Sequence, residues 1–180
     1  MNRGAVQRFR WRPDIVYTRH DNRVVTWTKT LNWKTLVRIC FTLPLLPAAA
    51  MAADEYARDR QHLVEEIVQS VRDTSLYLDK EELDPRVMTA IASVPRHEFI
   101  PAAYRSLAYA NRPLPLGHGQ TISQPYIVAL MTDLIKPQPG DRILEIGTGS
   151  GYQAAILAEL AGQVYSIEII EALGKQAEKQ

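Results

Sequence analysis

The sequence predicts an α/β fold in which N-terminal helices are followed by the start of a doubly wound parallel sheet. Residues 142–147 form an apolar segment that runs into a glycine-rich turn, a helical pattern at 152–161 and a second apolar segment at 163–168. This β-α-β-α order is how a doubly wound sheet begins. Because only two such strands are visible in the 180 residues, we expect the sheet to be incomplete in this chain.

Composition argues against several other protein classes. The chain is 46% hydrophobic and 23% charged, which is ordinary for a globular protein. Its formal net charge of +1 gives no overall attraction to nucleic acid, so no nucleic-acid partner is expected. Cys40 is the single cysteine, so no disulfide can form within the chain. The four histidines have no ligand spacing, and we therefore predict no metal.

Residues 1–30 form a basic extension that we expect to be disordered. Two interpretations stay open. In the first, the start codon is assigned too early and translation begins near Leu31. In the second, the extension is a basic arm that binds a partner.

Residues 31–53 have the layout of a secretory signal peptide. Lys34 and Arg38 precede an uncharged run that ends with Ala50 and Ala52 on either side of a methionine. The run is shorter than the ~20 residues of a spanning helix, so we expect no stable membrane anchor. The segment suggests a periplasmic protein, and the alternative is a weakly ordered tail on a cytosolic one.

Residues 54–180 are expected to form the N-terminal part of one domain. An apolar stripe predicts an amphipathic helix over residues 56–78, and Asp84 with Pro85 predicts the start of a second helix that ends before Pro95. Further along, the sequence predicts a short helix at 102–108, a long ordered loop, a helix at 124–136, the buried strand 142–147 and the helix and strand that follow it.

The turn after the first strand has the pattern of a cofactor-binding loop. Glycines are required where a turn uses backbone angles closed to other residues and where a ligand approaches the backbone amides. Dinucleotide-binding loops favour G-x-G-x-x-G, whereas the spacing here is G-x-G-x-G, which disfavours NAD. Glu145 stands two positions before the first glycine, as in S-adenosylmethionine-dependent enzymes. The predicted cofactor-binding residues of the loop are Glu145, Gly147, Thr148, Gly149, Ser150 and Gly151.

Glu168 ends the second strand, about twenty residues beyond the loop. An acidic side chain in this place can accept hydrogen bonds from both ribose hydroxyls of a nucleoside. The alternative is that the glycines form only a tight turn and that Glu168 is an exposed residue at the end of a strand. Loop, helix, strand and glutamate together favour the cofactor site, with residues 139–180 as its cofactor half.

From Val94 to Ile170 the chain resembles the protein-L-isoaspartate O-methyltransferases, which are class I methyltransferases with a Rossmann-like fold. The matching blocks are VPRHEFIP, YANRPLPLGHGQTISQPYIVALM, RILEIGTGSGYQAAILAEL and VYSIE. The glycine loop is shared by most class I methyltransferases, whereas GQTISQP is peculiar to this family. The resemblance implies S-adenosyl-L-methionine as methyl donor, isoaspartyl-containing proteins and peptides as substrates, and a monomeric enzyme.

The same resemblance implies that Ser123 is the active-site serine, with Thr121 and Gln124 beside it to position the substrate. Since a carboxylate is already ionised at neutral pH, its methylation needs no general base. Ser123 is therefore interpreted as a hydrogen-bond donor that orients the carboxylate, not as a nucleophile. The alternative is that Ser123 caps the following helix. His118 is interpreted as a loop residue.

Two features depart from the family pattern. The family fold continues well beyond the equivalent of residue 180, so we expect residues 53–180 alone to be unstable and catalytically inactive. A cooperative melt together with S-adenosylmethionine binding by that segment would contradict this. A signal-like segment also conflicts with a cofactor that is made in the cytosol. The alternatives to isoaspartyl repair are another class I methyltransferase and an inactive cofactor-binding fragment.

Overall fold

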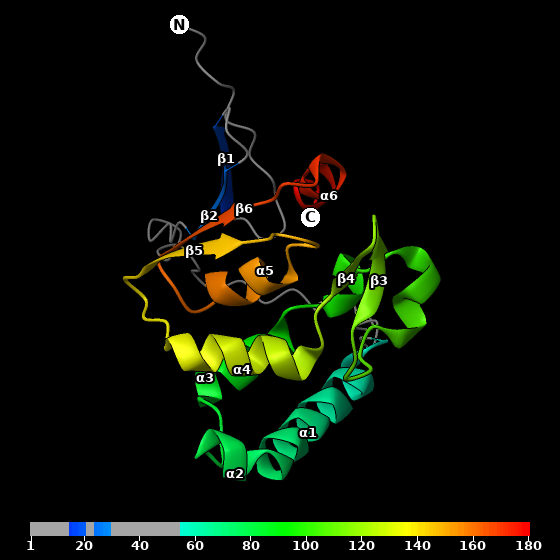
Figure 1. The fold of residues 1–180 in the computed structure, drawn as a ribbon, viewed down its shortest axis with the longest axis vertical. Helices are drawn as coiled ribbons and strands as arrows, with labels where there is room; N and C mark the ends of the chain where they lie inside the picture. Colours follow the sequence, from blue (N-terminus) through cyan, green and yellow to red (C-terminus); the bar gives the residue numbers. More distant parts are fainter. Residues whose placement is uncertain (1–14, 21–23, 30–54) are drawn as a thin grey trace, which may run out of the picture.

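The computed structural model describes residues 15–20, 24–29 and 55–180 (Figure 1). A layer of helices formed by the first half of the domain lies below α5 and the sheet in this view. The predicted signal-like segment 31–53 lies outside the described residues. Within the described ranges, no helix has the length and apolar character needed to cross a membrane.

The helical layer matches the predicted order of elements. The first amphipathic stretch forms α1 (Ala57–Asp73), which buries Leu63, Ile67 and Val71, and a short α2 (Ser75–Leu78) follows it. The helix α3 (Pro85–Ser93) begins as predicted, because the Asp84 side chain accepts a hydrogen bond from the Arg86 backbone N–H at 2.8 Å. Two 3₁₀ helices come next, η2 (Arg96–Phe99) and η3 (Ala102–Leu107).

The segment predicted to be a long loop contains a β-hairpin. Strand β3 (Leu114–Gly117) pairs antiparallel with β4 (Gln120–Ile122). Leu114, Leu116 and Ile122 are buried in the main core, and this alternation is hard to see in the sequence because proline and glycine occupy the exposed positions. His118 lies in the connecting turn with a φ of 53°, which confirms that it is a loop residue.

The sheet begins with two parallel strands, as predicted. After α4 (Pro125–Ile135), strand β5 (Arg142–Ile146) pairs in parallel with β6 (Gln163–Ile167) through the crossover helix α5 (Tyr152–Ala158). The last element is α6 (Glu171–Ala177). The α/β prediction is therefore confirmed.

Two further strands lie within residues 1–30, where the sequence predicted disorder. Strand β1 (Ile15–His20) pairs antiparallel with β2 (Val24–Lys29), and β2 pairs antiparallel with β6. The resulting four-stranded sheet has the order β1-β2-β6-β5. Backbone pairing explains the difference, because the free edge of β6 offers hydrogen-bonding groups that an extended segment can satisfy.

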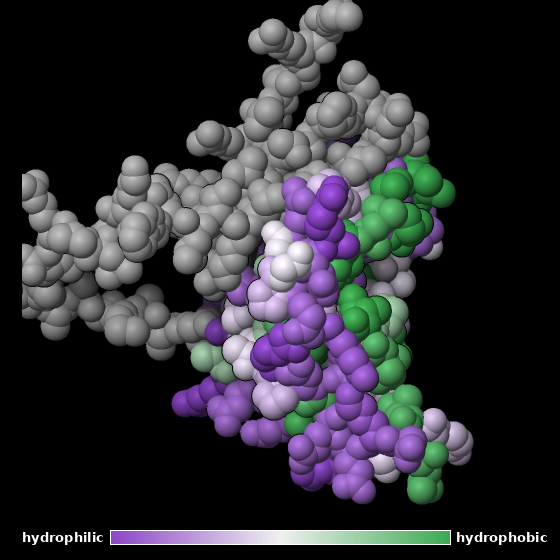
Figure 2. All heavy atoms as spheres, turned by 90° about the vertical axis from the view of Figure 1, so that its left-hand side faces the viewer, coloured by the Kyte–Doolittle hydropathy of each residue, from purple (hydrophilic) through white to green (hydrophobic). Residues whose placement is uncertain are grey.

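One face of the molecule carries many exposed apolar side chains. On β5, Leu144 and Ile146 are 58% and 72% exposed, so the prediction of a buried strand is wrong. Side chains alternate between the two faces of a strand. Ile143 faces the α5 cluster, whereas none of the described residues covers the opposite face, which carries Leu144 and Ile146. Exposed hydrophobic residues also lie on α4, namely Ile127, Met131, Leu134 and Ile135. Figure 2 shows hydrophobic residues gathered along one edge of the described part.

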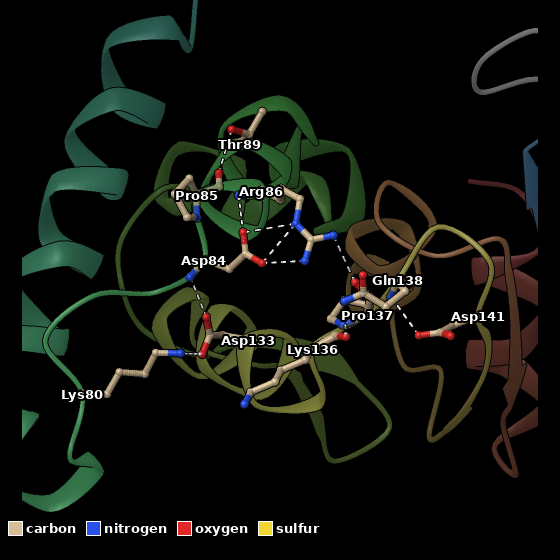
Figure 3. Close-up of polar contacts among 10 residues, drawn as sticks. All are labelled: Lys80, Asp84, Pro85, Arg86, Thr89, Asp133, Lys136, Pro137, Gln138 and Asp141. Carbon is tan, nitrogen blue, oxygen red and sulfur yellow. Dashed lines mark hydrogen bonds and ion pairs between the residues drawn. The ribbon is translucent and has the colours of Figure 1, made fainter.

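A polar network joins the start of α3 to the end of α4 (Figure 3). The carboxylate of Asp133, which is only 2% exposed, forms an ion pair with Lys80 and accepts a hydrogen bond from the Asp84 backbone N–H at 2.6 Å. Arg86 extends the network by donating to the Asp84 carboxylate at 2.6 Å and to the Pro137 carbonyl at 3.3 Å. The network fixes α4, and with it the loop that precedes α4, against the helical layer.

We predict that Asp133→Asn lowers the free energy of unfolding of the full-length protein by about 1–3 kcal/mol, because a neutral amide cannot replace a carboxylate that accepts from two donors. Lys80 is 33% exposed and can turn toward water, so the loss stays below that of a fully buried ion pair. Urea denaturation measures the change. The control is Asp73→Asn on the exposed surface of α1, and an equal effect of both substitutions would contradict the role of the network.

Candidate active site

The glycine-rich turn between β5 and α5 adopts backbone angles that favour glycine. Gly147, Gly149 and Gly151 have φ values of 93°, 54° and 86°. The N–H groups of Gly147 and Thr148 donate to the Ile167 carbonyl at 2.7 and 3.2 Å, so the turn is attached to the end of β6. Gly151 is the N-cap of α5, and its N–H donates to the Thr148 carbonyl at 2.8 Å.

Glu168 lies against this turn and is 8% exposed. Its Oε2 accepts a hydrogen bond from the Gly149 N–H at 2.7 Å, and its Oε1 accepts one from the Ile170 N–H at 2.8 Å. The alternative interpretation, in which Glu168 is an exposed residue at the end of a strand, is therefore wrong. Each carboxylate oxygen has two lone pairs, so capacity remains for the hydroxyl donors of a ribose.

Glu145 is the second acidic residue of the turn. Its carboxylate accepts a hydrogen bond from Ser166, whose hydroxyl is also 2.6 Å from that of Thr148. Burial raises the pKa of Glu145 to about 7, an effect that the Ser166 hydrogen bond opposes and the nearby Glu168 charge reinforces. Near neutral pH the Glu145 side chain is therefore only partly ionised, and its ionised form is a strong hydrogen-bond acceptor.

The loop that carries the predicted catalytic serine joins β4 to α4. Thr121 and Ser123 are exposed, and within the described residues the Ser123 hydroxyl makes no hydrogen bond. The N-cap of α4 is Gln124, so the alternative that Ser123 caps this helix is wrong. Pro125 at the first helical position moves the start of the helix one residue further. The Gln124 side chain donates to the Asn111 carbonyl at 3.0 Å, which turns it away from the serine loop.

One cleft of about 320 Å³ brings the two predicted sites together. It is lined by residues of the β4–α4 loop, the glycine turn and the start of α5: Thr121, Ile122, Ser123, Val128, Glu145, Gly147, Thr148, Gly149, Ser150, Tyr152 and Gln153. The other predicted site residues, Gln124, Gly151 and Glu168, are not among its lining residues. Glu168 contacts the lining through its hydrogen bond from the Gly149 N–H. Larger hollows of about 630 and 680 Å³ lie beside α3, but none of the predicted site residues lines them.

A family model described as protein-L-isoaspartate(D-aspartate) O-methyltransferase matches residues 64–180. The chain belongs to this family. Protein-L-isoaspartate O-methyltransferase 2 of Syntrophobacter fumaroxidans is 57% identical over 142 residues, which are 79% of this chain and 58% of that protein. Protein-L-isoaspartate O-methyltransferase 1 of Cupriavidus necator is 57% identical over 133 residues, which are 73% of this chain and 51% of that protein. The chain thus spans little more than half the length of these relatives.

Solved structures agree on the fold. The structure matches that of a Plasmodium falciparum protein-L-isoaspartate O-methyltransferase in complex with S-adenosyl-L-homocysteine, with a TM-score of 0.52 and 22% identity. The match covers 67% of this chain and 53% of that one. A second protein-L-isoaspartate O-methyltransferase matches with a TM-score of 0.51 and 25% identity, over 64% of this chain and 37% of that one.

The cleft has features that fit a nucleoside cofactor with an amino-acid tail. A side chain added at Gly147 would point into open space, so its absence leaves room for a ligand next to the turn. The Gln153 Oε1 atom is buried and has no partner within the described residues, which makes it available to a ligand donor. Acceptors on Glu145, Glu168 and Gln153 complement the ammonium and hydroxyl donors of S-adenosylmethionine. In the described part of the chain, no group of His, Cys, Asp and Glu side chains has the arrangement of a metal site.

Sequence reasoning assigned no role to several residues that shape the site. Ser166 joins Glu145 to Thr148, and Asn111 accepts a hydrogen bond from the Tyr126 N–H at 3.0 Å, which fixes the first turn of α4. Gln153 donates to Thr132 at 2.8 Å, and this bond holds α5 against α4. These contacts join residues 15 to 21 positions apart, so no local pattern could have revealed them.

We predict that Glu145→Gln changes stability in a pH-dependent way. Because the pKa is raised from 4.5 to about 7 on folding, the folded state holds this proton more tightly than the unfolded state. The stability that this group contributes is fully present below the unfolded-state pKa of 4.5. It is lost as the pH rises through the folded-state pKa of about 7. A glutamine is neutral at every pH and avoids that loss, which amounts to at most about 3 kcal/mol.

Thermal unfolding of the full-length protein measures the effect. As the pH rises from about 5 to about 8, the free energy of unfolding of Glu145→Gln should increase relative to that of the unchanged protein. Glu65→Gln, on the exposed surface of α1, is the control and should show no such trend. A difference that stays constant across this range would contradict the raised pKa.

Proposed function

We propose that the complete protein transfers a methyl group from S-adenosyl-L-methionine to the free carboxylate of L-isoaspartyl residues in damaged proteins and peptides. The observation that supports this most strongly is the shared cleft, which is lined both by Thr121 and Ser123 and by the glycine turn. Family membership and the names of the relatives support the same reaction.

The cofactor half of the site is formed by the glycine turn and its acidic neighbours. At Gly147 the turn has open space where another residue would carry a side chain, so its backbone is accessible to the ligand, and the Glu168 carboxylate would accept from the ribose hydroxyls. Glu145 lines the cleft and its carboxylate suits the ammonium of the amino-acid tail. Bound S-adenosylmethionine supplies a methyl group on a positively charged sulfur.

The reaction itself asks little acid or base chemistry of the protein. A substrate carboxylate with a pKa near 4 is ionised at neutral pH, so no proton has to be removed before it attacks the methyl carbon. One carbon–sulfur bond breaks, one carbon–oxygen bond forms, and the products are a methyl ester and a neutral thioether. The protein has to hold the carboxylate in line with the breaking bond and exclude water from it.

Ser123 is the residue proposed to do this. It lines the cleft and is exposed, and its hydroxyl makes no hydrogen bond within the described residues, so the hydroxyl is available to donate to a carboxylate oxygen. Thr121 lines the same wall and offers a second hydroxyl. Gln124 acts less directly, because its amide donates to Asn111 and so stabilises the loop that carries the serine.

We predict that the full-length protein incorporates labelled methyl groups into an isoaspartyl peptide and not into its normal aspartyl twin. Equal incorporation into both peptides would contradict the repair function and favour another class of methyltransferase. No incorporation into either, with the cofactor still bound, would favour an inactive binding protein.

We further predict that Ser123→Ala lowers kcat/KM for the isoaspartyl peptide by about 10- to 100-fold, because the carboxylate loses a donor that orients it. Affinity for S-adenosylhomocysteine should stay within about 3-fold of the unchanged protein, since the serine is proposed to bind the substrate and not the cofactor. Ser106→Ala, at an exposed position of η3, is the matched control. An unchanged kcat/KM in Ser123→Ala would exclude the serine from substrate positioning.

Export to the periplasm is a separate proposal that rests only on the signal-like sequence 31–53. The predicted result is a mature protein that begins shortly after Ala52 and is found in the periplasmic fraction. N-terminal sequencing and fractionation of cells that express the tagged gene measure it. An intact N-terminus at Met1 in the cytosol would contradict export.

A further inference from the structure

Arg96 is the largest side chain that the described part of the protein buries completely, with 0% exposure. It begins η2, directly after Pro95, and η2 connects the helical layer to the segment that leads into the hairpin. A fully buried arginine is unusual, because the guanidinium loses its hydration and several kcal/mol must be regained from other contacts. Its contacts therefore indicate what the arginine does.

Two of its hydrogen bonds go to backbone carbonyls of separate segments. The Nε atom donates to the Ala108 carbonyl at 2.9 Å, and one terminal nitrogen, Nη2, donates to the Ser123 carbonyl at 2.8 Å. The second of these bonds holds the residue whose hydroxyl is the proposed substrate donor. Because the guanidinium is planar and rigid, it fixes the direction of both carbonyls at once.

The guanidinium of Arg96 also contacts a residue that lines the cleft, Tyr152. The Arg96 Cζ atom is 4.9 Å from the centre of the Tyr152 ring, a distance suited to a cation–π contact. Tyr152 follows the last glycine of the turn, is 1% exposed and packs edge-on against Phe99. One side chain thus touches both the residue that is proposed to orient the substrate and the first residue of the helix after the cofactor turn.

The positive charge of Arg96 has no carboxylate partner among the described residues. Burial lowers the pKa of Arg96 to about 10, so the side chain stays protonated at neutral pH. Burial also raises the pKa of Tyr152 to about 12, and this ring therefore supplies no negative charge. An unbalanced cation behind the cleft favours a bound anion over a neutral ligand.

We infer that Arg96 is a positioning residue which holds Ser123 against the cofactor turn and whose charge favours an anionic substrate. This inference rests on the proposed isoaspartyl methyltransferase function. Arg96 acts through Ser123, so the effect of changing it depends on whether the serine hydroxyl is present. A purely structural arginine would not show that dependence.

A double-mutant cycle in the full-length protein tests this. Arg96→Lys keeps the charge, but one ammonium cannot reproduce the fork that reaches two carbonyls. Where Ser123 is present, we expect Arg96→Lys to lower kcat for the isoaspartyl peptide by about 10- to 100-fold. In the Ser123→Ala background, the same substitution should lower kcat by less than about 3-fold. Affinity for S-adenosylhomocysteine, measured by calorimetry, should change by less than about 3-fold.

Arg96→Gln separates charge from geometry. It removes the cation, so the KM for the isoaspartyl peptide should rise by about 10-fold more than in Arg96→Lys. Arg105→Lys, at an exposed position of η3, is the matched control and should leave all three values unchanged.

Each other outcome contradicts either the inference or the function on which it rests. Equal effects of Arg96→Lys with and without the Ser123 hydroxyl would show that the arginine does not act through the serine. Loss of the cooperative urea transition in both Arg96 variants would show that it serves the fold and not one loop. If the unchanged protein fails to methylate the isoaspartyl peptide, the proposed function fails first, and the inference fails with it.

Discussion

Parallel pairing of β5 with β6 is the interaction on which the candidate site depends. The register sets Ile146 opposite Ile167, so both strands end at the same edge of the sheet. The glycine turn and Glu168 follow these two residues and meet there, joined by the hydrogen bond from the Gly149 N–H. A slip of one residue would turn Glu145 and Ser166 to opposite faces, because side chains alternate along a strand. Strand register therefore brings Glu145 and Ser166 together beside the glycine turn.

The substrate side of the cleft depends on a different set of contacts. Its loop is held by buried polar groups from the helical layer, and Arg96 and Asn111 bind the backbone on either side of Gln124. The network around Asp133 then fixes α4, which starts from the same loop (Figure 3). Such contacts are costly when incomplete, so they specify one arrangement more strictly than apolar packing would.

Local sequence patterns predicted the elements whose stability is largely local. The cap at Asp84, the stripe of α1 and the strand–turn–helix around Gly147 all form as expected, because capping, amphipathicity and glycine turns act over a few residues. Proline and glycine hide the alternation of the hairpin at 114–122, so the sequence pattern predicts only a loop there. The prediction that the strand at 142–146 is buried is wrong for one of its faces, because the sequence does not show which face of the sheet is covered by helices.

The amino-acid sequence alone shows a glycine-rich turn of the G-x-G-x-G type, and its segment from Gly119 to Pro125 indicates the protein-L-isoaspartate O-methyltransferase family, to which the chain belongs. Both are properties of short continuous segments. Three further facts come from the folded arrangement: the two segments share one cleft, burial raises the pKa of Glu145, and Arg96 donates a hydrogen bond to the Ser123 carbonyl. They depend on residues 12 to 32 positions apart being brought together, and packing of the whole domain fixes that proximity.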